Sequence, residues 1–167
     1  MMIYRELGRT GLEVSVLSYG ASGLGNILGT PDEGRGIRTV HTAIDLGINL
    51  VDTSPMYGET RSESLLGKAL RQIPRDSYYL ATKVGRHAGG VSDFSAERIM
   101  QSVDESLGRL ELDYVDILQC HDIDFVPLDQ IVEESLPALR RLQEQGKTRF
   151  VGITGFPLKV YRYVLDR

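Results

Sequence analysis

The sequence is poor in the features that mark secreted, membrane-spanning and nucleic-acid-binding proteins. Its 167 residues include one cysteine, Cys120, which excludes an internal disulfide framework and is typical of a reducing compartment. The net charge is −4 and no block of lysine and arginine occurs, so nothing favours nucleic-acid binding. No run approaches the roughly 18 apolar residues of a membrane span, and the charged start MMIYRELGRTG has no apolar signal segment. These absences predict one domain in a soluble, cytoplasmic protein without a membrane or nucleic-acid partner.

The common local motifs of metal, nucleotide and thiol chemistry are also missing. No P-loop, C-x-x-C, H-E-x-x-H or G-x-S-x-G pattern occurs, and His41 and His87 are too isolated to indicate a metal site. A thiol nucleophile at Cys120 beside His121 is disfavoured, because adjacent strand residues point to opposite faces. The loop GASGLG (20–25) has G-x-x-G-x-G spacing, whereas the dinucleotide fingerprint is G-x-G-x-x-G. We interpret this loop either as a close backbone approach to a ligand or as a plain turn.

Strand-like and helix-like segments alternate along the chain after a predicted N-terminal hairpin. The hairpin is expected over 3–17, and strands are expected over 14–20, 48–52, 77–84, 114–120 and 148–154. Helices are expected over 33–47 and over 128–146, the second with a kink or break at Pro137. Three further helices are expected to begin at the N-cap candidate Ser62, at Ser95 and at Pro157. This order suits βαβ units, and both an open doubly wound sheet and a (β/α)₈ barrel match it. Because such barrels typically need about 250 residues, length alone favours the open sheet.

Side chains with acid–base chemistry stand at three successive predicted strand ends. Asp52, Lys83 and His121 lie at, or within one residue of, the carboxyl ends of the second, third and fourth strands, and Tyr57 lies in the loop after Asp52. The carboxyl ends of parallel strands form the ligand face of α/β folds. Taken singly, each residue has an ordinary interpretation: a loop-amide acceptor, a solvated lysine, a hydrogen-bonded rim histidine and a packed tyrosine ring. Together they favour a single proton-transfer site.

These four side chains complement one another chemically. A tyrosine has an ordinary pKa of about 10, and lowering it by about three units needs roughly 4 kcal/mol of preferential anion stabilisation. An ammonium at about 4 Å supplies an interaction of that size at an effective dielectric constant of about 20. We therefore expect Lys83 to activate Tyr57, and Asp52 to keep Lys83 charged. His121 would orient the reacting oxygen, so the set suits proton exchange at a carbonyl or alcohol oxygen, the partner step of a hydride transfer.

The motifs around these residues resemble the N-terminal part of the aldo-keto reductases. The segments that carry the resemblance are LGRTGLEVSVLSYGA, GINLVDTSPMYG, SESLLGKAL, YYLATKVG, SVDESLGRLELDYVDILQCHD and GKTRFVGIT. The resemblance implies a (β/α)₈ barrel with a hairpin closing its bottom, of which residues 1–167 would form a single partial domain with about five βα units. It reverses the preference based on length.

The resemblance also implies the roles of individual residues. The catalytic tetrad of the family falls on the four residues already selected, Asp52, Tyr57, Lys83 and His121, and Asp52 also lies at the cofactor. Many members carry Ser-Asn against the nicotinamide at the end of the fifth strand, where this sequence has Thr154 followed by glycine. Only Thr154 is carried over as a cofactor contact.

The implied activity is that of a plant-type sugar dehydrogenase within the family. Such an enzyme would oxidise the anomeric carbon of L-galactose to the 1,4-lactone in ascorbate synthesis, with NAD, or alternatively NADP, as hydride acceptor and a small sugar as its partner. The oligomeric state is left open. The family's nicotinamide-stacking and pyrophosphate-binding segments do not match any part of residues 1–167, so we expect the isolated chain to have little or no activity. The alternative is a non-catalytic half-barrel or a regulatory short form without cofactor binding.

Overall fold

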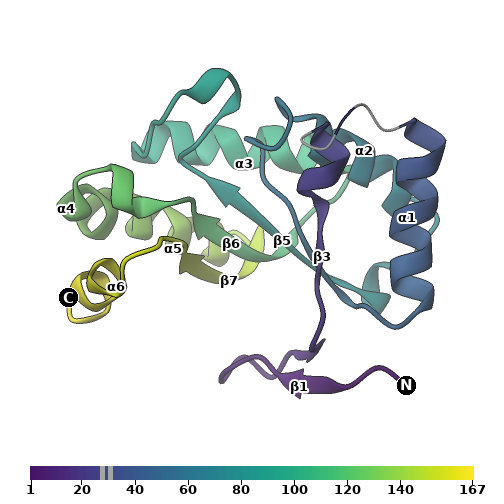
Figure 1. Cartoon of the computed structure of the whole chain (residues 1–167). Helices are drawn as coiled ribbons and strands as arrows, with labels where there is room; N and C mark the ends of the chain where they lie inside the picture. Colours follow the sequence, from purple (N-terminus) through teal and green to yellow (C-terminus); the bar gives the residue numbers. More distant parts are fainter. Residues whose placement is uncertain (27–28, 30–31) are drawn as a thin grey trace.

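The computed structural model describes residues 1–26, 29 and 32–167, which form a small hairpin beneath a parallel sheet flanked by helices (Figure 1). The elements are β1 (Tyr4–Glu6), β2 (Glu13–Ser15), β3 (Tyr19–Gly20), η1 (Ala21–Gly25), α1 (Glu33–Asp45), β4 (Leu50–Asp52), α2 (Arg61–Leu70), η2 (Arg75–Ser77), β5 (Tyr79–Val84), η3 (Ala88–Gly90), α3 (Ala96–Leu110), β6 (Val115–Cys120), η4 (Ile123–Phe125), α4 (Leu128–Gln130), η5 (Ile131–Ser135), α5 (Leu136–Glu144), β7 (Thr148–Ile153) and α6 (Leu158–Leu165). The predicted alternation of strands and helices is thereby confirmed.

The order of strands in the sheet distinguishes the open doubly wound sheet from the barrel that the family resemblance implies. The parallel strands lie in the order β3-β4-β5-β6-β7, which is also their order in the chain. A doubly wound sheet reverses direction at a switch point, whereas a barrel adds each strand beside the previous one. Consecutive helices pack on one another, α1 on α2, α2 on α3 and α3 on α5, as in the outer ring of a barrel. The open sheet favoured by length alone is therefore wrong, and the sheet is an arc of a (β/α)₈ barrel.

The hairpin and the first parallel strand divide a segment that the sequence predicts as one strand over 14–20. Ser15 ends β2, where its backbone N–H donates to Asn49 Oδ1 at 2.7 Å, and Asn49 Nδ2 donates back to the carbonyl of Glu13 at 2.9 Å. Only Tyr19 and Gly20 pair with β4. The apolar run is therefore split because its first part binds the hairpin and the loop before β4.

The starts of α3 and α2 test the two N-cap residues predicted from the sequence. Ser95 is the N-cap of α3, accepting a hydrogen bond from the Arg98 N–H at 3.4 Å, as its sequence context predicts. The expectation that Ser62 caps α2 is wrong, because the N-cap is Thr60 and Ser62 lies inside the helix. The Ser62 hydroxyl instead donates to the carbonyl of Ala21 at 2.7 Å, and so joins α2 to the glycine loop.

The long helix predicted over 128–146 runs through α4, η5 and α5 without a break. The expected irregularity is present, but it precedes Pro137: residues Ile131–Ser135 form a π-helical turn, and Pro137 lies in the first turn of α5. Proline has no N–H to donate to the preceding turn, and wider winding just before it accommodates that missing bond. Ser135 fixes this turn by donating to the carbonyl of Phe94 at 2.7 Å.

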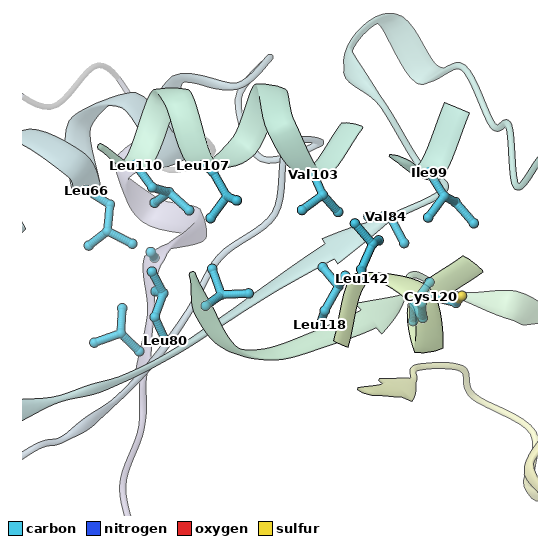
Figure 2. Packing of buried hydrophobic residues seen from close by; sticks show 14 of the residues in the cluster. Leu66, Leu80, Val84, Ile99, Val103, Leu107, Leu110, Leu118, Cys120 and Leu142 are labelled. Carbon is cyan, nitrogen blue, oxygen red and sulfur yellow. The ribbon is translucent and has the colours of Figure 1, made fainter. Parts of the chain in front are cut away.

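The core lies between the sheet and its helices. The side of α3 that faces the sheet carries apolar residues at helical spacing, among them Ile99, Val103 and Leu107 (Figure 2). Leu80 of β5 and Leu118 of β6 are fully buried in the same cluster. The strands therefore have their outer side chains fixed by helices, which leaves their carboxyl ends free to carry polar groups.

A buried carboxylate joins α2, β5 and α3. Glu63 accepts hydrogen bonds from Thr82 Oγ1 at 2.7 Å and from Arg109 Nε at 2.8 Å, so its charge is paired where water is absent. The two helices approach closely here, since a Cβ on Gly67 would lie 2.4 Å from the carbonyl oxygen of Arg109. Glycine at this position is required by the packing of α2 on α3.

The helix contact predicts opposite effects for two glycine-to-alanine substitutions. Gly67→Ala forces backbone atoms apart and should lower the free energy of unfolding by about 1–3 kcal/mol. Gly108→Ala is the matched control, because it lies in α3 with nothing within 4 Å of the added Cβ. It should raise the free energy of unfolding by about 0.4–1 kcal/mol through the unfolded state. Urea unfolding followed by circular dichroism measures both, and equal effects would contradict the close approach.

Candidate active site

Three of the predicted site residues come from the carboxyl ends of β4, β5 and β6. Asp52 pairs with Ala81, which places Lys83 two residues further along the neighbouring strand, on the same face as Ala81. Lys83 Nζ donates to Asp52 Oδ1 at 2.6 Å and to the carbonyl of Thr53 at 2.8 Å. The lysine is only 5% exposed, so these oxygens replace water around its ammonium. The structure thus brings the predicted acid and lysine into direct contact.

Tyr57 lies beside the Lys83 ammonium, and His121 lies beside Tyr57. Lys83 Nζ is 4.9 Å from the centroid of the Tyr57 ring. The Tyr57 and His121 rings are 5.7 Å apart between centroids and meet edge to face at 85°. All four residues predicted as catalytic from the strand ends are therefore gathered at one rim of the sheet.

The loop that carries Tyr57 is held by backbone contact with the glycine loop. A Cβ on Gly58 would lie 2.0 Å from the carbonyl oxygen of Gly25, and a Cβ on Gly25 would lie 2.7 Å from Gly58 N. Gly58, Glu59 and Thr60 all have positive φ, between 57° and 70°, which is costly for the two residues that carry a Cβ. Part of the GASGLG loop therefore supports the turn after Tyr57 through close backbone packing.

His121 is held by residues on both sides of its ring. Its Nδ1 is 3.1 Å from the hydroxyl of Ser54, and its Nε2 is 3.7 Å from Asp122 Oδ2. Burial lowers the pKa of the imidazole from its ordinary value to about 4, opposed by the Asp122 carboxylate and assisted by the cations Lys83 and Arg86. His121 is therefore neutral near pH 7 and suited to hydrogen bonding rather than to carrying charge.

Asp122 is itself fixed by neighbouring strands. Its backbone has φ 52° and ψ 62°, an uncommon left-handed conformation for a residue with a side chain. The Asp122 N–H donates to Thr154 Oγ1 at 2.8 Å, the Thr154 hydroxyl donates to Asp122 Oδ1 at 3.3 Å, and Arg86 forms an ion pair with the same carboxylate. Thr154, predicted as a cofactor contact, thus reaches the rim but directs its hydroxyl to Asp122.

Sequence reasoning did not assign roles to Ser54, Arg86 or Asp122. Ser54 lies within the DTSPMYG motif, and Asp122 directly follows a predicted strand-end residue, so position along the chain was an available signal for both. Arg86 carries no comparable signal, because only the pairing of β5 with β6 brings it to Asp122. Cys120 is fully buried, and burial raises the pKa of its thiol to about 12, which agrees with its exclusion as a nucleophile.

The rim can support proton exchange at an oxygen atom. It offers one phenol beside a charge-paired ammonium and a neutral imidazole. Within residues 1–26, 29 and 32–167, no group of three or more metal-binding side chains is clustered. No helix in the same part of the chain is both long and apolar enough to cross a bilayer. Asp52, whose side chain is 33% exposed, and Thr154 are the two residues predicted from the sequence as cofactor contacts, and both lie at this rim.

The sequence and the fold define the class of protein. The aldo/keto reductase family matches residues 16–167. The chain therefore belongs to the aldo/keto reductase family, and the resemblance seen in its motifs is confirmed. The chain is similar to an aldo-keto reductase from Bacillus halodurans in its holo form, with 34% identity and a TM-score of 0.88 over 100% of this chain and 55% of that one.

Within the family, the chain is similar to sugar dehydrogenases. It is 58% identical to L-galactose dehydrogenase of Arabidopsis thaliana over 165 residues, which are 98% of this chain and 51% of the Arabidopsis protein. It is 40% identical to D-arabinose 1-dehydrogenase of Saccharomyces cerevisiae over 128 residues, 74% of this chain and 37% of the yeast protein. The chain spans about half the length, or less, of these curated relatives.

The surroundings of His121 predict how its titration responds to substitution. The imidazole should titrate with a pKa of about 4, as read from its Cε1 proton resonance. Lys83→Met removes a cation and should raise this pKa, whereas Asp122→Asn removes an anion and should lower it further. His121→Gln assigns the resonance, and a pKa near the ordinary value of 6.5 would contradict the burial of the ring.

The lowered pKa of His121 also predicts how the stability of the fold depends on pH. The unfolded chain binds more protons at this histidine than the folded chain between pH 6.5 and about 4, so acidification through that window lowers the free energy of unfolding. His121→Gln should flatten this part of the profile. Because burial also lowers the pKa of His87, the comparison is made in a His87→Gln background.

Proposed function

We propose that these residues form the proton-transfer part of an NAD-dependent L-galactose dehydrogenase, which oxidises the anomeric carbon of the sugar to the 1,4-lactone. The observation that carries the proposal is the buried contact of Lys83 with Asp52, with the ammonium 4.9 Å from the Tyr57 ring centroid. The 58% identity to the Arabidopsis enzyme supports L-galactose as the substrate. The single, buried thiol supports a reducing, cytoplasmic location.

The chain's own residues account for movement of the proton. The positive charge of Lys83 favours the phenolate form of Tyr57, and Asp52 and the carbonyl of Thr53 hold the ammonium in place. Tyr57 then accepts the proton of the anomeric hydroxyl as the carbon–hydrogen bond breaks. His121, neutral near pH 7, hydrogen-bonds to the same oxygen and fixes the distance between it and the phenol.

The residues at the rim fit the nicotinamide end of a dinucleotide in part. Asp52 gives one carboxylate oxygen to Lys83 and remains partly exposed, so it can line a cofactor as well as hold the lysine. Thr154 follows β7, the strand beside the one that ends at His121, and its hydroxyl is directed to Asp122. When bound, NAD would supply the hydride acceptor; nothing at these two residues distinguishes it from NADP.

The proposal predicts that Tyr57 is essential in a chain of the length of its relatives. We would join residues 1–167 to the following half of the Arabidopsis enzyme and measure L-galactose-dependent reduction of NAD. Tyr57→Phe removes the proton acceptor and should lower kcat by about 10²–10⁴-fold. Tyr79→Phe is the matched control, since Tyr79 starts β5 and lies far along the strand from Lys83; it should leave kcat unchanged.

The outcomes separate catalysis from the non-catalytic alternative. An active chimera in which Tyr57→Phe retains most of the turnover would sink the assigned role of the tyrosine. A folded chimera that oxidises neither L-galactose nor related aldoses would instead favour a half-barrel without catalytic function. Replacing NAD by NADP in the same assay tests the cofactor.

A further inference from the structure

Ser54 places a buried hydroxyl against the catalytic histidine. The side chain is fully buried, and its Oγ lies 3.1 Å from His121 Nδ1. The same oxygen accepts a hydrogen bond from the backbone N–H of Met56 at 3.2 Å. These are the polar partners of the Ser54 hydroxyl among the residues that the structure describes.

The hydrogen-bond partners of the Ser54 hydroxyl determine whether the serine or the ring nitrogen is the donor in the contact with His121. Met56 N–H is a donor, so the Ser54 proton needs an acceptor, and His121 Nδ1 is the acceptor within reach. If Nδ1 carried the ring proton instead, the buried hydroxyl would keep a proton with no acceptor, which is unfavourable. Ser54 therefore donates to an unprotonated Nδ1, and the neutral ring carries its proton on Nε2.

The opposite end of the ring favours the same form through independent contacts. Asp122 Oδ2 lies 3.7 Å from His121 Nε2, too far for a hydrogen bond but close enough to favour an N–H over a lone pair. Arg86 and Thr154 hold this carboxylate in place. Both ends of the imidazole thus select one tautomer before any substrate is present.

We propose that Ser54 is a positioning residue that fixes His121 as its Nε2–H tautomer, so that the open end of the ring donates a hydrogen bond to the oxygen of the sugar. The inference rests on the proposed function for the identity of that oxygen, but the tautomer itself is a property of this chain. It assigns the proton-accepting role to Tyr57 alone, because a ring protonated on Nε2 and bonded through Nδ1 has no free lone pair.

The tautomer can be measured directly on the 167-residue chain. Nitrogen-15 NMR of the imidazole near pH 7 separates a protonated ring nitrogen from a bare one, and His121→Gln identifies the signals. We expect Nε2 to be protonated and Nδ1 to be a bare, hydrogen-bonded nitrogen. A protonated Nδ1 would overturn the proposal, and this measurement needs no variant at Ser54 and no substrate.

A substitution then tests whether Ser54 is the cause. In Ser54→Ala, Nδ1 loses its donor, so its resonance should move to higher frequency. Ser62→Ala is the matched control: Ser62 is also fully buried, but its hydroxyl bonds to the Ala21 carbonyl and to Thr53 Oγ1. That variant should leave the His121 signals in place. An Nδ1 resonance unchanged in Ser54→Ala would overturn the proposal.

Activity gives the second readout, in the chimera used for Tyr57. Ser54→Ala should lower kcat by about fivefold, the size expected for loss of one orienting hydrogen bond, with a smaller effect on KM. A shifted resonance with unchanged kcat would show that Ser54 bonds the ring without positioning it for reaction. If the expected tautomer is found but the chimera is inactive, the proposed function fails while the assignment of the ring proton stands.

Discussion

The buried ammonium of Lys83 is the constraint around which the rest of the rim is arranged. A lysine that is 5% exposed keeps its charge only if nearby oxygens replace water, and here Asp52 and the carbonyl of Thr53 do so. The strand that carries Asp52 and the strand that carries Lys83 must therefore keep a fixed register. The parallel pairing of β4 with β5, backed by a close-packed core, provides that register. The Lys83 ammonium also lies near the Tyr57 ring. Its positive charge adds to the effect of burial in lowering the pKa of His121.

The loop after Asp52 shows how backbone strain can serve a site. Three successive residues adopt positive φ after Tyr57, and two of them carry side chains. This unfavourable backbone conformation accompanies a close contact, because the backbones of Gly25 and Gly58 meet at a distance that leaves no room for a Cβ at either residue. Ser62, buried in α2, donates to the carbonyl of Ala21 and secures the same loop. The backbone of Tyr57 is thus held between β4 and α2 by these contacts.

Much of the fold and the position of the site could be predicted from the sequence, and the errors have identifiable causes. Strand ends were readable because apolar runs stop at Asp52, Lys83 and His121. The role of Ser62 was misread because serine favours an N-cap locally, whereas a distant carbonyl took its hydroxyl. The hydrogen bond from the Thr154 hydroxyl to Asp122 likewise could not be predicted, since it depends on how β7 lies beside β6.

The sequence by itself determined the alternation of strands and helices, the kinds of side chain at the strand ends and membership of the aldo/keto reductase family. The alternation and the strand-end residues follow from periodicity and spacing, which are local properties of a chain, whereas the family follows from the resemblance of whole motifs. The family resemblance also implied the barrel, and the order of the strands in the sheet confirms it. The positions of Ser54 and Asp122 at opposite ends of the His121 ring are visible in the tertiary structure alone. Hydrogen bonds and charges act over a few ångströms, so their partners are set by which strands and loops meet in space.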